Sequence, residues 1–162
     1  MKFCVECGNK LEEKLLEGEG MIPYCNNCQQ YRFPIFNTAV SMVVLNETGD
    51  KILLIKQYGG DFCILVAGYV NKGESAENAV AREVKEEVGL TVTSCHFNKS
   101  EYFEKSNTLM LNFSCYVSDE SLEGVTEEVD HAEWFSIEEA RANIKEGSLA
   151  QRFLESYVAK RK

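Results

Sequence analysis

Residues 68–90 have the sequence GYVNKGESAENAVAREVKEEVGL. Near the end of this stretch, REVKEE places an arginine beside three glutamates, Glu83, Glu86 and Glu87. The whole chain already has a formal net charge of −9, and like charges at these helical spacings cost about 0.2–0.5 kcal/mol per pair. The glutamates therefore form either a solvated helix face or a binding site for a multiply charged cation.

The apolar spacing of this stretch predicts a helix. Val80, Val84 and Val88 recur every four residues, which indicates one buried stripe. Ser75 can cap the N-terminus and Gly89 can end the helix, so we expect it over residues 75–88. The three glutamates share a face offset from the valine stripe, and we expect their carboxylates to point away from the core. Hard cations such as Mg²⁺ or Mn²⁺ prefer such oxygen ligands.

The complete pattern is G-x5-E-x7-R-E-V-x-E-E-x-G-L, running from Gly68 to Leu90. It resembles the signature of the Nudix hydrolases, and every fixed position of that signature is met. The resemblance implies an α+β fold, an α/β/α sandwich around a mixed sheet, over residues 34–162. It also implies roles for particular residues: metal binding by Glu83, Glu86 and Glu87 with the carbonyl of Ala67 or Gly68, and support of the loop and helix by an Arg82–Glu74 ion pair.

The family's reaction is the attack of water on a phosphorus of a diphosphate, assisted by Mg²⁺ or Mn²⁺. A general base must lie within hydrogen-bond reach of that water. The candidates are Glu83 and Glu86 on the helix, and Glu128 in the segment TEEVDHAEWF. Glu128 resembles the acidic residue that completes the metal site in family members, although it could also belong to an ordinary acidic loop.

A second motif lies at the N-terminus, where four cysteines form two C-x2-C pairs: Cys4, Cys7, Cys25 and Cys28. Two such pairs separated by 17 residues are typical of tetrahedral zinc coordination. A redox motif would not explain two matched pairs, and the start MKFCVECGNK is not a signal peptide that would favour disulfides. We expect a structural zinc ribbon over residues 1–33.

Charge limits the partners of the chain. Residues 1–33 contain four basic and five acidic side chains, so the ribbon lacks the basic stripe of a nucleic-acid reader. The pI near 4.8 disfavours nucleic acid and anionic membranes, and the longest apolar run, residues 62–70, is about half the roughly 20 residues of a membrane span. We expect a cytoplasmic protein with a small-molecule nucleotide substrate.

The remaining chain supplies the strands that the fold requires. The apolar runs 38–46 and 51–58 flank a turn and predict a hairpin. Residues 62–70 predict a buried strand, residues 91–97 and 109–117 two more, and HAEWFSIEEARANI a strand end followed by a helix capped at Ser136. The C-terminal LAQRFLESYVAKRK predicts an amphipathic helix.

The cysteine quartet ahead of the glutamate motif resembles the layout of NADH pyrophosphatases. That branch has an S-Q-P-W-type stretch after the motif. In this chain Ser100 fits the serine, while Glu101, Tyr102 and Phe103 replace the other three residues. Preference for NADH is therefore not implied, and ADP-ribose, another ADP-linked compound and a flavin nucleotide stay open as substrates. Tyr102 and Phe103 could stack on a base, although aromatic residues at strand ends more often belong to a core. The resemblance also implies a homodimer.

The sequence also allows a non-catalytic alternative to the hydrolase. In it, the domain senses a nucleotide without cutting it and the ribbon contacts a partner. Degenerate domains of this kind usually lose glutamates of the motif, whereas this chain keeps all of them. Metal-dependent hydrolysis that disappears on substitution of Glu86 or Glu87 separates the two possibilities.

Overall fold

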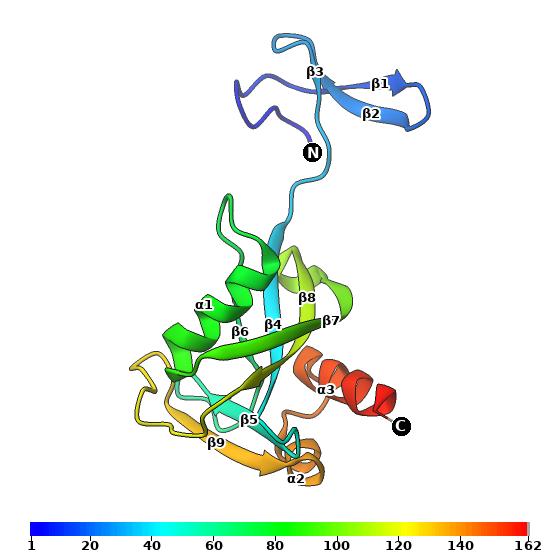
Figure 1. Ribbon diagram of the computed structural model, residues 1–162. Coiled ribbons are helices and arrows are strands. Elements are labelled where there is room, and N and C mark those ends of the chain that lie inside the picture. Colours follow the sequence, from blue (N-terminus) through cyan, green and yellow to red (C-terminus); the bar gives the residue numbers. More distant parts are fainter. Residues whose placement is uncertain (162) are drawn as a thin grey trace. The chain divides into compact units, whose positions relative to one another are not determined.

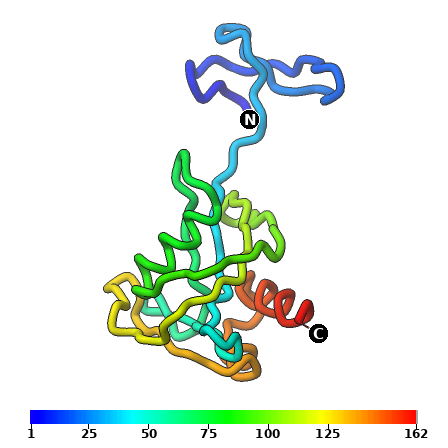
Figure 2. Tube along the Cα trace, in the orientation of Figure 1, coloured from blue at the N-terminus to red at the C-terminus, as the bar shows by residue number. Residues whose placement is uncertain are grey.

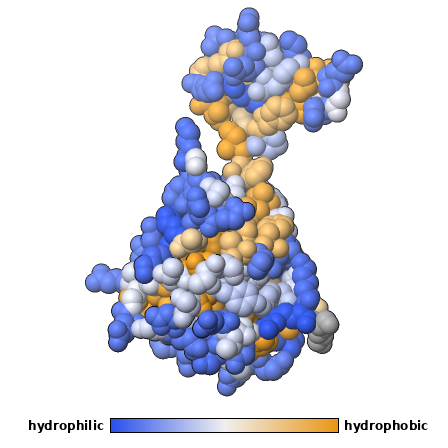
Figure 3. Space-filling model, viewed as in Figure 1, coloured by the Kyte–Doolittle hydropathy of each residue, from blue (hydrophilic) through white to orange (hydrophobic). Residues whose placement is uncertain are grey.

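The computed structural model describes residues 1–161, and the chain divides after Phe36 into two compact units (Figure 1). The small unit contains a three-stranded antiparallel sheet in the order β1-β2-β3, with β1 at Glu12–Leu16, β2 at Gly20–Cys25 and β3 at Gln30–Tyr31. Its buried cluster consists only of Cys4, Leu11 and Cys25, with Cys28 partly buried against it. Several of its apolar side chains are exposed: Phe3, Val5, Leu15 and Met21. Hydrophobic patches are visible on the surface in Figure 3.

The large unit is a layered α/β structure. Its strands are β4 (Asn37–Leu45), β5 (Lys51–Lys56), β6 (Val66–Tyr69), β7 (Val92–Phe103), β8 (Thr108–Val117) and β9 (His131–Ser136). Its helices are α1 (Ala76–Val88), α2 (Ile137–Asn143) and α3 (Leu149–Lys160), and a short 3-10 turn, Glu104–Ser106, joins β7 to β8. No helix in residues 1–161 is long and apolar enough to cross a membrane.

The sheet is mixed and centres on β4. Five strands follow the order β7-β8-β4-β5-β9, and β6 pairs with β4 in addition. The β4–β8 pair is parallel and the other pairs are antiparallel. One half of β4, Ala39–Met42, pairs with β6, while the other half pairs with β5 at Val44 and Leu45. β4 therefore forms the predicted hairpin with β5 and also pairs with β6, the short strand that leads into the glutamate motif.

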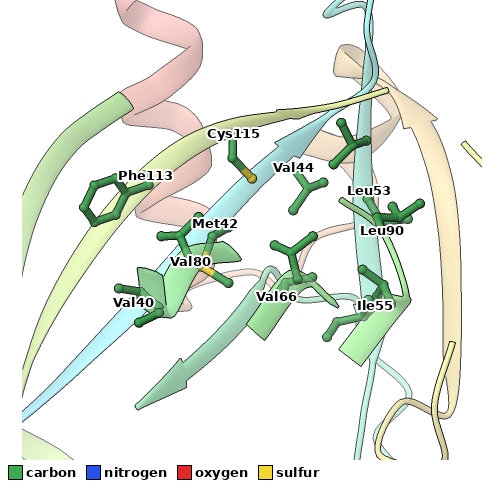
Figure 4. Packing of buried hydrophobic residues seen from close by; sticks show 14 of the residues in the cluster. Val40, Met42, Val44, Leu53, Ile55, Val66, Val80, Leu90, Phe113 and Cys115 are labelled. Carbon is green, nitrogen blue, oxygen red and sulfur yellow. The ribbon is translucent and has the colours of Figure 1, made fainter. Parts of the chain in front are cut away.

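Helices cover the two faces of this sheet. On one face, the α1 stripe of Val80, Val84 and Val88 is fully buried in a cluster with residues of β4, β5 and β8. Figure 4 shows Val80 among buried side chains of these strands. On the other face, Phe153 and Leu154 of α3 pack with α2 against a second cluster. The predicted α/β/α sandwich with a mixed sheet is confirmed.

The ends of α1 agree with the sequence prediction. The Ser75 hydroxyl accepts a hydrogen bond from the backbone N–H of Asn78, and Gly89 ends the helix with φ of 74°, a left-handed conformation that favours glycine. The strand predicted over 62–70 is shorter, because only 66–69 pair regularly and Cys63 and Ile64 form isolated bridges. The helix capped at Ser136 has a full capping box with Glu139.

Candidate active site

Arg82 organises the motif by connecting the loop before α1 to the helix. Its Nε and Nη2 atoms donate to the two carboxylate oxygens of Glu74 at 2.8 and 2.9 Å, and Nη2 also donates to the Tyr69 carbonyl at 2.9 Å. The predicted ion pair is therefore present and bidentate. These hydrogen bonds from Arg82, with one from the Asn71 backbone N–H, lower the pKa of Glu74 to about 2.

The same guanidinium also contacts two of the predicted metal ligands. Arg82 Nη1 donates to Glu83 Oε1 at 2.7 Å and to Glu86 Oε2 at 2.9 Å. The Glu83 side chain is largely covered, with 12% of it exposed, whereas that of Glu86 is 57% exposed. Within residues 1–161, only the four cysteines bring three or more ligand atoms within 4.8 Å of one another. A cation among the glutamates would therefore compete with Arg82 for Glu83 and Glu86.

Glu87 differs from the expectation that all three carboxylates point away from the core. The residue is only 5% exposed, and burial raises its pKa to about 7, assisted by the negative charges of Glu83, Glu128 and Glu86. Its Oε1 accepts a hydrogen bond from Gln57 Nε2 at 3.0 Å, while Oε2 is buried with no partner among the described residues. A buried carboxylate with one unsatisfied oxygen is costly unless something else binds it.

Gly68 lies directly against Glu83. A Cβ atom at position 68 would come within 1.9 Å of Glu83 Cδ, so no larger residue fits while Glu83 keeps this position. Gly68 belongs to β6, where it is paired with Val40 of β4. The fixed glycine of the motif thus leaves space for a carboxylate.

Gly68→Ala is expected to displace the Glu83 carboxylate without unfolding the protein, because the clash falls on the end of a flexible side chain. We expect divalent-metal affinity to fall by about 10–100-fold, as when supporting residues of metal sites are changed. Titration with Mn²⁺ measures this, and a thermal melt checks the fold. Adding Gly68→Ala to a Glu83→Ala variant should change little further; equal losses in both backgrounds would contradict a role through Glu83.

The loop that contains Glu128 is fixed to the end of α1, and Figure 2 shows the two segments side by side. The Thr126 backbone N–H donates to the Glu87 carbonyl at 3.1 Å. Gly89 and Gly124 meet so closely that a Cβ on Gly89 would lie 2.6 Å from the Gly124 Cα. These contacts hold Glu128, a residue distant in sequence, beside the helix that contains the other glutamates.

These residues surround a pocket of about 410 Å³. Its lining contains three acidic residues, Glu83, Glu87 and Glu128, together with Ala67 and Gly68. Besides Arg82, the other residues that line the pocket are uncharged: Ala39, Tyr58, Tyr69, Asn71, Ser106, Thr108 and Met110. Glu86 lies outside this pocket, in an adjoining hollow that it shares with Glu128. The all-oxygen ligand set and the unpaired oxygen of Glu87 fit a hard divalent cation.

Two of the sequence candidates lie elsewhere. Tyr102 and Phe103 line a separate hollow of about 490 Å³, near the start of α3. Residues just beyond them, Thr108 and Met110, line the glutamate pocket instead, because the parallel β4–β8 pairing places Met110 beside Ala39. The sequence did not predict Gln57, Tyr58 and Asn71 as residues of the site. The only local feature that could have indicated them is a polar or aromatic side chain just beyond a buried strand.

The four cysteine sulfurs of the small unit lie within 4.8 Å of one another. Cys4 and Cys28 Sγ are 3.9 Å apart, and Cys7 and Cys25 Sγ are 3.5 Å apart. A tetrahedral zinc ion with bonds of about 2.3 Å requires sulfur separations of about 3.8 Å, so the quartet fits zinc. Arg32 Nε donates to Cys4 Sγ at 3.3 Å and can compensate the negative charge of a thiolate cluster.

Comparison with known families supports this geometry. The sequence model of the NUDIX domain matches residues 36–156. The chain belongs to the Nudix family. The matched residues contain the whole glutamate motif, the Glu128 loop and most of α3.

Curated relatives extend the similarity of this Nudix chain into the cysteine unit. A protein named NAD-capped RNA hydrolase NudC from Stutzerimonas stutzeri is 33% identical over 162 residues, covering 99% of this chain and 57% of the relative. The protein of the same name from Pseudomonas aeruginosa is 31% identical, covering 99% of this chain and 56% of the relative. The chain thus spans somewhat more than half the length of these relatives.

Solved structures show the same fold. A NUDIX hydrolase from Nitrosomonas europaea superposes with a TM-score of 0.69 at 21% identity, covering 99% of this chain and 92% of that structure. A second structure of that description from the same organism has a TM-score of 0.64 at 27% identity, covering 79% of this Nudix chain and 92% of its own. The predicted Nudix fold is confirmed.

Proposed function

We propose that this chain is a metal-dependent hydrolase that cleaves the diphosphate of a nucleoside diphosphate linked to a second group. The observation that carries the proposal is the buried Glu87, which has an unpaired oxygen in a pocket shared with Glu83 and Glu128. Folding has gathered negative charge where it is destabilising for the protein alone. This arrangement is what a site for a divalent cation and a polyphosphate requires.

The acidic residues and Arg82 would have different roles in the reaction. Glu83 and Glu87, with Glu86 and a backbone carbonyl of Ala67 or Gly68, would bind Mg²⁺ or Mn²⁺. The bound ion would neutralise the phosphates and lower the pKa of the attacking water. Glu86 and Glu128 border one hollow, so either could accept the proton of that water. Arg82 would hold Glu74 and the loop in place throughout.

The substrate proposal follows from the names of the relatives. Because they are called NAD-capped RNA hydrolases, we propose a dinucleotide of the NAD type, either free or at the 5′ end of an RNA. The RNA substrate departs from the sequence expectation of no nucleic-acid partner. The acidic balance of residues 1–33 supports the free dinucleotide, since an RNA backbone would gain no counterion release there.

The test is a hydrolysis screen with Mg²⁺ or Mn²⁺ over NADH, NAD⁺, ADP-ribose, FAD, diadenosine polyphosphates, nucleoside triphosphates and NAD-capped RNA. A coupled phosphatase detects newly exposed phosphomonoesters, and gel mobility detects decapping. We expect turnover of at least one diphosphate-linked nucleotide and none without added divalent metal. If every compound is bound and none is cleaved, the chain is a non-catalytic nucleotide sensor and the hydrolase proposal is wrong. Equal rates with and without metal would contradict the glutamate site.

A further inference from the structure

Tyr58 has an unusual backbone and an exposed ring at the rim of the glutamate pocket. Its φ is +58°, in the left-handed region that bulky residues rarely occupy, and the residue is 92% exposed. It nevertheless lines the pocket that contains Glu83, Glu87 and Glu128. The ring is thus almost fully hydrated and contributes little apolar burial to folding.

The neighbours of Tyr58 hold this turn in place. The Gly59 backbone N–H donates to Asp130 Oδ2 at 2.7 Å, and the Asp130 N–H donates to the Lys56 carbonyl at 2.8 Å. On the other side of Tyr58, the Gln57 side chain donates to Glu87. The turn is therefore fixed both to α1 and to the loop that contains Glu128. Strained backbone held in this way is found more often at functional sites than elsewhere.

The chemistry of the pocket indicates what the ring could contact. Phosphates would lie beside Glu83, Glu87 and Glu128, where the proposed cation would bind, and the group attached to them would contact uncharged residues of the same pocket, Tyr58 among them. An exposed phenol ring at the rim offers a flat apolar face to a planar heterocycle. Stacking of an aromatic side chain on a base is worth about 10-fold or more in affinity.

We propose that Tyr58 is a stacking platform for the planar ring of a nucleoside diphosphate, and so determines specificity for base-bearing diphosphates. The proposal rests on the proposed function for the position of the diphosphate. It explains why an aromatic residue occupies a position where glycine or asparagine would fit the backbone better.

The experiment measures binding by calorimetry, so it does not depend on turnover. The probes, with Mg²⁺ present, are α,β-methylene-ADP, which has a base, and methylenediphosphonate, which has none. Tyr58→Ala is expected to weaken α,β-methylene-ADP about 10-fold and to leave methylenediphosphonate unchanged. Tyr58→Phe should keep wild-type affinity for both probes, since it keeps the ring.

Two further variants separate stacking from a structural effect. Tyr58→Gly removes the backbone strain, so it should raise the melting temperature and still lose base affinity as Tyr58→Ala does. Phe62→Ala changes another exposed aromatic residue of the same connection, which does not line the pocket, and should alter neither affinity. The proposal is overturned if the wild type binds the two probes equally, or if Tyr58→Ala affects both or neither. If the screen finds no hydrolysis but the base-dependent loss is observed, the enzyme proposal fails and the stacking role holds.

Discussion

Glu87→Gln is expected to lower turnover strongly and, in buffer without added Mg²⁺ or Mn²⁺, to make the protein more stable. The buried carboxylate has one oxygen without a partner and lies near the charges of Glu83 and Glu128. A neutral amide of the same shape removes both the repulsion and the desolvation of a charge. Loss of a metal ligand should lower kcat/KM by about 10²–10³-fold, because a bound metal contributes several kcal/mol to the transition state.

The stability gain should depend on pH in a defined direction. The pKa of Glu87 is raised from 4.5 to about 7, so between these values the folded protein binds a proton that the unfolded chain releases. Stability contributed by this proton is complete below about pH 4.5 and is lost as the pH rises through 7. The variant does not titrate there, so its advantage should grow from near zero at pH 4.5 to at most about 3 kcal/mol above pH 7.

Melting temperatures from pH 4.5 to 8, together with kcat/KM, measure both effects. Glu86→Gln is the matched variant: the side chain is 57% exposed, so turnover should fall without the stability gain. Glu77→Gln, an exposed glutamate at the start of the same helix, should change neither property appreciably. Full turnover in Glu87→Gln would contradict a ligand role, and a melting temperature that is lowered at pH 8 would contradict the unpaired buried charge.

The burial of Glu87 could have been predicted from the sequence. At 3.6 residues per turn, Glu87 lies about 20° from Val80 on the helix surface, at the edge of the valine stripe. The expectation that all three glutamates share one exposed face was therefore wrong for Glu87. On the helix surface, Glu83 lies at a larger angle from the valine stripe than Glu87, and Glu86 at a larger angle still. The helix, its caps and the glutamate spacing were predictable because these signals are local.

The uncharged residues of the pocket could not be predicted in this way. Thr108 and Met110 reach it only through the parallel register of β4 with β8. Gln57 meets Glu87 across 30 residues of sequence, at the end of a strand whose length depends on its partners. Registers and strand ends of this kind are fixed by tertiary pairing, which a single sequence does not specify. The same dependence explains why Tyr102 and Phe103, close to Thr108 in sequence, lie in another hollow.

Removal of zinc, or Cys25→Ser, is expected to unfold the small unit and leave the large unit folded. The buried cluster of the small unit contains only Cys4, Leu11 and Cys25, far too little apolar surface to stabilise three short strands. Structural zinc bound to such units contributes about 10–16 kcal/mol, so a zinc ion held by the four cysteines would supply the folding free energy of the small unit. The large unit has two buried clusters of its own on opposite faces of its sheet.

Amide hydrogen exchange resolves the two units in one experiment. Chelation should remove protection from β1–β3 and leave β4, β5 and β8 protected, and metal analysis of the untreated protein should give one zinc per chain. Arg32→Gln keeps all four sulfur ligands but removes the hydrogen bond to Cys4, so zinc affinity should fall about 10–100-fold with the fold retained. Cys95→Ser, outside the quartet, should leave zinc binding unchanged. If strands β1–β3 stayed protected in the zinc-free protein, the small unit would have a source of stability other than the metal, and its cysteines would need another explanation.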